Sequence, residues 1–261
     1  MSRLLDHIAA VSPPDHLVVV GVRFLSPTAK NGRHLGHFHW IAPASIVRLP
    51  AWWQQQQTTQ LLEDWAWIHE VVGGPDAAIR GRHIHLLHPG VPMVRLVTAR
   101  TRPEVAGRLQ ELSSAHGIMV DVDIAERRPG DRRRYCPTVL HGLEFLAAYK
   151  PSVIIDGGGG LIAAWLFAEP AEPTATKHLA ADVITDVGLG TDRKGWEFDS
   201  PVFGGQWLKV PGCYDHFRRV EVCELSGGPV WEFEQLRSIV PRYPRRASRR
   251  WIYIGGRAVR V

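Results

Sequence analysis

The chain has 261 residues, 45% of them hydrophobic and 22% charged, with a formal net charge of +5 and a pI near 9.4. This composition is typical of a soluble globular protein that buries a substantial core. No stretch approaches the roughly 20 apolar residues of a membrane span, and residues 1–10 lack a signal-peptide core, so we expect a cytoplasmic protein without a membrane partner.

The first hundred residues have the pattern of a mixed α/β module. The turn signal Asn31-Gly32 separates two apolar runs and predicts a hairpin. Helical spacing of Trp52, Trp53, Trp65 and other apolar residues predicts a helix with a core face. The predicted elements are a strand at 17–24, its hairpin partner at 36–41, a helix at 52–70, and strands at 82–87 and 94–98.

From residue 103 onward, helical and strand patterns alternate. The predicted elements are helices at 103–117, 137–149 and 175–187, with strands at 118–124, 152–156, 161–167, 206–210 and 218–225. The order strand, helix, hairpin, helix, strand predicts an α+β fold with an RRM-like sheet. We therefore predict one domain over 1–240, built from an N-terminal module of about 1–102 and an RRM-like module of about 103–225, and a basic tail over 241–261.

Two acidic residues stand out in the segment VDVDI at 120–124. Strand periodicity places Asp121 and Asp123 on one face and the neighbouring apolar residues on the other. Two carboxylates this close repel each other unless a cation lies between them, and hard oxygen ligands suit Mg²⁺ or Mn²⁺. The alternative is an exposed strand face with two solvated acids.

Basic residues follow the acidic pair and recur near the C-terminus. Guanidinium groups near aromatic rings suit phosphates and unstacked bases, whereas the alternative is a solvated basic surface. The nucleic-acid contacts that we predict are Arg127, Arg128, Arg132, Arg133 and Arg134, and the C-terminal group is Arg242, Arg245, Arg246, Arg249 and Arg250.

Two further segments could approach a ligand. Four glycines, Gly157 to Gly160, join two apolar strands and permit positive φ or close backbone approach, although a plain hairpin tip has the same composition. The segment WLKVPGCYDHFRRVEV at 207–222 combines a Pro-Gly turn with Lys209, His216 and Arg218, which suit phosphates. An ordinary basic hairpin is the alternative.

In this order, the three segments resemble the archaeo-eukaryotic primase family, in its plasmid- and phage-type primase-polymerase branch. That family has an Asp-x-Asp strand, a hairpin Ser-Gly-x-Gly-Leu-His-x-Tyr-Trp, a further aspartate, and a turn Arg-x-Pro-Gly-Thr-x-Asn-x-Lys. The counterparts here are Asp121 and Asp123, the hairpin 157–165, Asp192 within Gly190-Thr191-Asp192, and the turn 209–217. The resemblance covers about 120–220 well and the first hundred residues loosely.

The resemblance implies a two-module primase-polymerase fold and a template-dependent nucleotidyltransferase that makes or extends primers with two Mg²⁺ or Mn²⁺ ions. It makes Asp121, Asp123 and Asp192 the catalytic residues and metal ligands, with Asp186 and Asp199 as rivals to Asp192. The implied nucleotide-binding residues are Gly158, Gly159, Gly160, Ile162, Lys209, His216 and Arg218. The implied partners are nucleoside triphosphates, a single-stranded DNA template or primer-template, and a replicative helicase.

Departures from the family pattern support a second hypothesis. Ile162 replaces the hairpin histidine, which contacts the triphosphate in the family, and Asp215 and Phe217 replace the asparagine and lysine of the later turn. Loss of one charged hydrogen bond costs roughly 1.5–3 kcal/mol. The alternative is therefore a catalytically degenerate DNA-binding replication-initiation protein with the same fold. A metal-dependent phosphoesterase of unrelated fold is disfavoured by the order of the segments.

Histidines and tryptophans allow further interpretations. The same-face pairs His37/His39 and His83/His85, and Cys136 with His141, are the only hints of zinc, and polar strand faces explain them better. Trp165, Trp196 and Trp207 flank the predicted site and could stack on a base, although core packing is the simpler expectation.

Overall fold

The structure, a computed structural model, describes residues 2–25, 34–55, 88–100, 112–128, 130, 132–198, 207–215, 218–225, 227–243, 251–254 and 257–260. Only the backbone is described for 22–25, 34–39, 55, 88–89 and the two C-terminal stretches. Most of the helix expected at 52–70 and the strand expected at 82–87 lie outside these residues. Within the described part of the chain, no helix has the length and apolar character needed to cross a membrane.

Several helices begin after a residue whose side chain caps them. Before α1 (Arg3–Val11), the Ser2 hydroxyl accepts the Leu5 N–H at 3.3 Å. Before α6 (Pro173–Arg193), the Glu172 carboxylate accepts the Thr174 and Ala175 N–H groups at 2.8 and 2.6 Å. The helical elements are α1 (Arg3–Val11), η1 (Pro43–Arg48), α2 (Leu49–Gln55), η4 (Ala125–Arg127), α5 (Val139–Ala147), α6 (Pro173–Arg193) and α7 (Phe233–Ile239).

The strands follow the predicted apolar runs, although several are longer. They are β1 (Leu17–Leu25), β2 (His34–Ile41), β3 (His88–Ala99), β4 (Ser114–Asp123), β5 (Val153–Asp156), β6 (Gly160–Ala171), β7 (Leu208–Lys209), β8 (Tyr214–Asp215), β9 (Val220–Glu221), β10 (Cys223–Leu225), β11 (Trp251–Ile254) and β12 (Arg257–Arg260).

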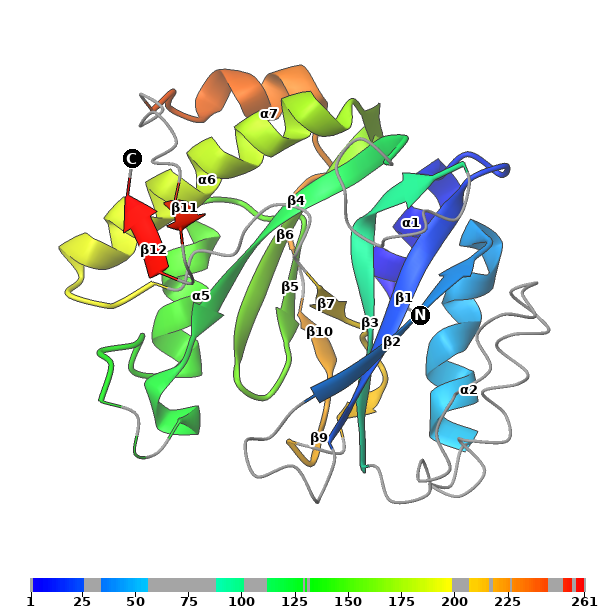
Figure 1. Ribbon diagram of the computed structural model, residues 1–261, viewed down its shortest axis with the longest axis horizontal. Coiled ribbons are helices and arrows are strands. Elements are labelled where there is room, and N and C mark those ends of the chain that lie inside the picture. Colours follow the sequence, from blue (N-terminus) through cyan, green and yellow to red (C-terminus); the bar gives the residue numbers. More distant parts are fainter. Residues whose placement is uncertain are drawn as a thin grey trace.

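One large antiparallel sheet runs through the described residues, in the order β10-β5-β6-β4-β3-β1-β2, and β7 pairs with β3. β3 pairs with β4 only through Val97 and Thr98, opposite Ala115 and Ser114. Further along, at Met93 and Val94, β3 pairs with β7 instead. The sheet therefore divides beyond this junction, and Figure 1 shows β3 and β4 diverging from it.

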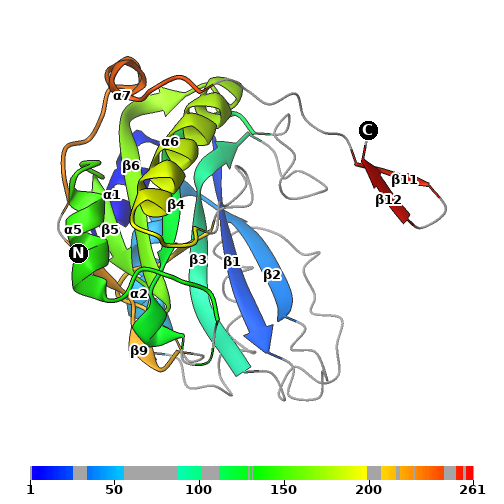
Figure 2. The ribbon, with the colours of Figure 1, turned by 90° about the vertical axis from the view of Figure 1, so that its left-hand side faces the viewer.

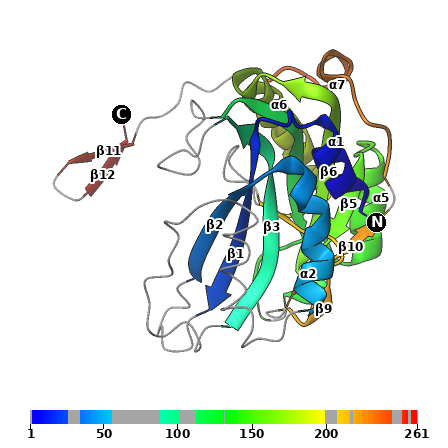
Figure 3. The same cartoon turned by 90° about the vertical axis from the view of Figure 1, so that its right-hand side faces the viewer.

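The predicted α+β fold with an RRM-like order of elements is confirmed, because β4-α5-β5-β6-α6-β10 repeats the order strand, helix, hairpin, helix, strand. α6 covers one face of this half of the sheet, as Figure 2 shows, and its Leu179 and Val183 pack in one core cluster with Val120 and Val122 of β4. α1 and α2 lie on the side that carries β1 to β3 (Figure 3). A second core cluster joins residues of α1, β1 and β3 to Ile162 of β6.

Some predicted boundaries were wrong. Residues 114–117, expected to end a helix at Gly117, begin strand β4. Gly117 was interpreted as a helix end, but a Cβ there would collide with the backbone of β6, so the glycine serves the close approach of two strands at a bulge. The strand expected at 218–225 is divided into β9 and β10, and β11 and β12 pair within the segment expected to be a basic tail. Helices α1 and α7 were not predicted.

Candidate functional site

The acidic pair lies at the C-terminal end of β4. Val120 and Val122 are buried in the core shared with α6, so Asp121 and Asp123 occupy the other face of the strand, as strand periodicity predicted. Asp121 is half-buried and pairs in register with Ile162, and Asp123, which is 8% exposed, pairs with Gly160. The two carboxylates therefore lie against the start of β6, next to the glycine hairpin.

The glycine hairpin is held close to its neighbours. A Cβ on Gly160 would lie 2.6 Å from the Val122 carbonyl oxygen and 3.2 Å from Asp121 Oδ1, so only glycine leaves space beside this carboxylate. Gly158 has a φ of +77°, and its N–H donates to Asp156 Oδ1 at 3.0 Å. The aspartate directly before the glycines thus fixes the turn, a role that its position in an Asp-Gly pair could have signalled.

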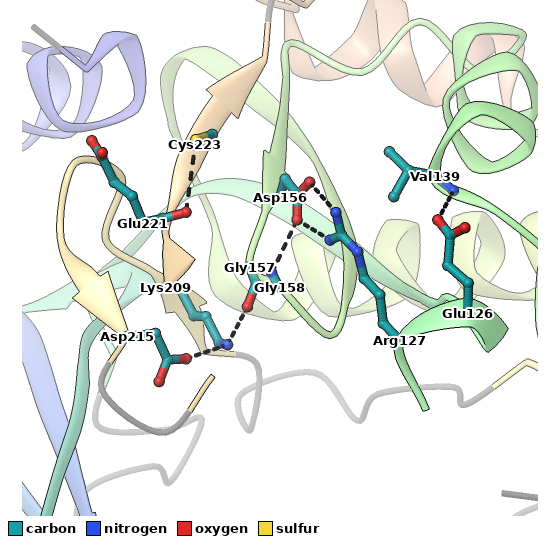
Figure 4. Close-up of polar contacts among 10 residues, drawn as sticks. All are labelled: Glu126, Arg127, Val139, Asp156, Gly157, Gly158, Lys209, Asp215, Glu221 and Cys223. Atoms are coloured by element: carbon teal, nitrogen blue, oxygen red, sulfur yellow. Dashed lines mark hydrogen bonds and ion pairs between the residues drawn. The ribbon is translucent and has the colours of Figure 1, made fainter. Parts of the chain in front are cut away.

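The residues on both sides of the Pro-Gly turn, Pro211-Gly212, lie beside this hairpin, and Figure 4 shows the contact that Lys209 makes with it. Lys209 Nζ donates to the Gly157 carbonyl and to Asp215 Oδ2, both at 2.6 Å. The Arg218 backbone N–H donates to Asp215 Oδ1 at 3.2 Å, and a Cβ on Gly159 would lie 3.0 Å from Arg218 Nη2. The structure therefore brings Lys209 and Arg218 together at the glycine hairpin. His216 lies outside the described residues.

Arg127 and Arg128, two of the predicted nucleic-acid contacts, are half-buried and pair with carboxylates. The turn η4 directs Arg127 onto Asp156, with a second hydrogen bond from Nη2 to Oδ2 at 2.9 Å, and Arg128 Nη2 onto Asp123 Oδ1. Burial alone would raise the pKa of Asp156, but the Arg127 and Gly158 donors outweigh burial and hold that pKa below its ordinary value. The same hydrogen bond raises the pKa of Arg127.

The other three predicted nucleic-acid contacts are exposed. Arg132, Arg133 and Arg134 follow the turn η4 on the surface, and the Arg133 guanidinium lies over the Tyr135 ring at 4.7 Å. Of the five arginines in this group, these three are therefore exposed, whereas the first two are half-buried and pair with carboxylates.

Asp192 does not join the acidic pair, contrary to the prediction. It is exposed in the last turn of α6, whose buried residues pack on the opposite face of the sheet from Asp121 and Asp123. Asp186 lies in the same helix and accepts a hydrogen bond from the Tyr243 hydroxyl, and Asp199 lies outside the described residues. Where the structure describes side chains, no group of three or more His, Cys, Asp or Glu residues is arranged to hold a metal ion.

Asp121 and Asp123 nevertheless fit a divalent cation in donor type. Both offer hard carboxylate oxygens from one strand face, and Gly160 lets the backbone of β6 approach Asp121 Oδ1 closely. Arg128 supplies positive charge to Asp123 in this structure. The two carboxylates are therefore the residues that would hold Mg²⁺ or Mn²⁺.

Ile162 and the tryptophans belong mainly to the core. Ile162 is 6% exposed and packs in the cluster that joins both halves of the sheet. Trp165 is buried and donates its Nε1 hydrogen to the Tyr149 carbonyl at 2.9 Å, and Trp196 packs against Phe145, so neither offers a ring to a base. Trp52 and Trp53, expected in the core, are both buried there.

The remaining zinc hints stay unsupported. Cys136 is buried, its thiol donates to the Thr138 carbonyl, and burial raises its pKa to about 11, which opposes the thiolate that zinc needs. The side chains of His37, His39, His83 and His85 lie outside the described residues.

The chain has the fold of a primase-polymerase AEP domain. No family model matches the sequence, and no curated protein matches it. Among solved structures, the chain is similar to the AEP domain (PP-N190) of the Cyanophage S-2L primase-polymerase, with a TM-score of 0.52 and 12% identity over 91% of this chain and 95% of that chain. The catalytic domain of primase RepB′, solved in complex with initiator DNA, covers the same shares at 12% identity, with a TM-score of 0.40.

Proposed function

We propose that this chain is a DNA primase-polymerase, a template-dependent nucleotidyltransferase that makes or extends primers. The observation that carries the proposal is the position of Asp121 and Asp123 directly beside the glycine hairpin, with Arg218 on the other side of that hairpin. In a primase fold, this arrangement supports a site that combines candidate metal ligands, a backbone that a ligand can approach closely, and a cation.

Each part of the site has a task that its chemistry suits. Asp121 and Asp123 would hold Mg²⁺ or Mn²⁺, which when bound would lower the pKa of the primer 3′-hydroxyl and neutralise charge on the departing pyrophosphate. Backbone N–H groups of the glycine hairpin and the Arg218 guanidinium would bind the triphosphate. Lys209 already bonds to Gly157 and Asp215, so its main task is to hold the hairpin against the Pro-Gly turn.

A second candidate is a catalytically degenerate primase-fold protein that binds DNA at a replication origin. Two observations favour it. Ile162, opposite Asp121, offers an apolar side chain where a triphosphate donor would stand, and Asp215 neutralises Lys209. Under this candidate, DNA binding persists without nucleotide incorporation.

A primer-extension assay with Mn²⁺ or Mg²⁺ separates the two candidates. We expect Asp121→Ala/Asp123→Ala to lower incorporation by at least about a hundredfold, because loss of a ligand costs more than the 10- to 100-fold typical of its supporting residues. Asp192→Ala is the matched control, since it removes an exposed acid from the opposite face, and it should incorporate nucleotides at the wild-type rate. Absence of incorporation by the wild type, together with intact DNA binding, would favour the degenerate candidate.

A further inference from the structure

Arg95 of β3 is a buried cation that forms no ion pair with another residue in the described part of the chain. The residue is 8% exposed, and its guanidinium lies over the ring of Trp207, 4.3 Å from the centroid. Its Nε has no hydrogen-bond partner, and no acid or carbonyl in the described residues pairs with the rest of the group. Burial lowers the pKa of Arg95 from its ordinary value, which reflects the cost of holding this charge away from water.

The other partly buried arginines of the described chain show how unusual this is. Arg127 pairs with Asp156, Arg128 with Asp123, and Arg237 with Asp182. A buried charge is normally compensated by an opposite charge or by several hydrogen bonds. Arg95 has only an aromatic ring, which fixes the plane of the guanidinium and leaves its N–H donors unused.

Arg95 and Trp207 lie next to the candidate site. Trp207 directly precedes β7, in which Leu208 pairs with Val94 of β3 and Lys209 donates to the carbonyl of Gly157. Two residues of extended chain span roughly 7 Å, so Trp207 lies within about that distance, backbone to backbone, of the lysine that holds the glycine hairpin. Arg95 and Trp207 therefore lie near the lysine that contacts the glycine hairpin.

We propose that Arg95, positioned by Trp207, binds a backbone phosphate of the single-stranded template. The guanidinium is planar and presents paired donors, which match the two free oxygens of a phosphodiester. A DNA strand is a better ligand for Arg95 than the nucleotide, because the glycine hairpin and Arg218 are proposed to bind the triphosphate. Arg95 instead belongs to β3, in the other half of the divided sheet. The identity of the strand as template rests on the proposed function, but the phosphate contact does not.

The test measures the affinity of the full chain for a fluorescein-labelled single-stranded oligonucleotide by anisotropy, in EDTA and without nucleotide. We expect Arg95→Met to weaken binding about tenfold and to reduce the slope of log affinity against log salt by about 0.7, the value for one phosphate on a single strand. Arg95→Lys should keep that slope but bind more weakly, because a point charge replaces a planar group. Trp207→Leu should weaken oligonucleotide binding and reduce the salt slope, because the Arg95 guanidinium loses the aromatic ring that positions it.

Arg193→Ala is the matched control, since Arg193 is exposed near the end of α6, on the helix that covers the opposite face of the sheet. The proposal is overturned if Arg95→Met binds the oligonucleotide like Arg193→Ala, or if it loses affinity for a nucleoside triphosphate with Mn²⁺ while keeping DNA affinity. Thermal unfolding checks each variant, and Arg95→Lys decides the matter if Arg95→Met does not fold. Because binding is measured without catalysis, an inactive wild type would contradict the proposed function and leave this test intact.

Discussion

The two ends of strand β4 bury polar groups in opposite ways. At the N-terminal end, His116 is fully buried, and its Nε2 lies 3.3 Å from the hydroxyls of both Ser12 and Thr98. Thr98 in turn contacts Ser114 at 2.6 Å and His16 at 3.0 Å. At the C-terminal end, the carboxylates Asp121 and Asp123 lie on one strand face, and Arg128 pairs with Asp123.

The two ends of β4 differ in how easily a bound ligand could replace an existing partner of the buried polar groups. The N-terminal network consists of hydroxyls and imidazoles sealed from solvent, and it can remain neutral. The C-terminal network carries full charges, and the Arg128 side chain that compensates Asp123 is 26% exposed. A partly exposed cation can be replaced by a bound cation at modest cost, whereas a sealed neutral network cannot, so the charged end is the one that suits a ligand.

Acidification should lower the free energy of unfolding most through the buried neutral network around His116. Burial, reinforced by the nearby His7 and His16, lowers the pKa of His116 to about 3. In the unfolded chain, His116 binds a proton near pH 6.5, whereas in the folded chain it stays neutral at that pH. The free energy of unfolding is therefore unaffected by His116 above pH 6.5 and falls by about 1.4 kcal/mol for each pH unit below it. Between pH 6.5 and 5 the loss should reach about 2 kcal/mol, measured by urea unfolding.

The matched variant is His116→Gln, which keeps a polar side chain but cannot titrate. It should lack this part of the pH dependence. Asp156 does not interfere, because its lowered pKa removes stability only as the pH falls below the ordinary aspartate value of 3.8. Equal pH dependence in wild type and variant between pH 6.5 and 5 would contradict the view of a sealed neutral network.

Removal of the Arg128 guanidinium at the C-terminal end of β4 should lower the free energy of unfolding less, and a bound metal ion should restore it. Arg128→Met removes one partner of Asp123 and should lower the free energy of unfolding by about 1–2 kcal/mol, less than loss of a fully buried pair because Arg128 is partly exposed. Mn²⁺ should then raise the melting temperature of Arg128→Met more than that of the wild type, because in the variant Mn²⁺ does not compete with Arg128 for Asp123. An equal Mn²⁺ response in both proteins would contradict the exchange of partners.

The smallest expected effect concerns the apolar residue beside the carboxylates. Ile162→His would place a donor opposite Asp121 and should tighten nucleoside triphosphate binding about tenfold, the value of one charged hydrogen bond. Ile162→Leu keeps the size and the apolar character, and it should bind the nucleotide like the wild type. Unchanged affinity of Ile162→His would count against the proposed position of the triphosphate.

Local pattern was enough to predict much of the fold. The alternation in VDVDI placed Val120 and Val122 in the core and both aspartates on the other face, because neighbouring side chains of a strand must point to opposite faces. The order of strands and helices after residue 103 predicted the α+β fold. Gly117 failed as a helix end because its role depends on the backbone of β6, which is distant in sequence.

What the sequence determined by itself was the acidic strand, the glycine hairpin and the Pro-Gly turn, in that order. Only the tertiary structure decided their partners. It placed Asp192 on the far face, turned Arg127 and Arg128 onto carboxylates, and set Arg95 over Trp207. Strand and helix periods are local properties of the chain, whereas ion pairs and stacking form between segments whose approach depends on the packing of the whole sheet.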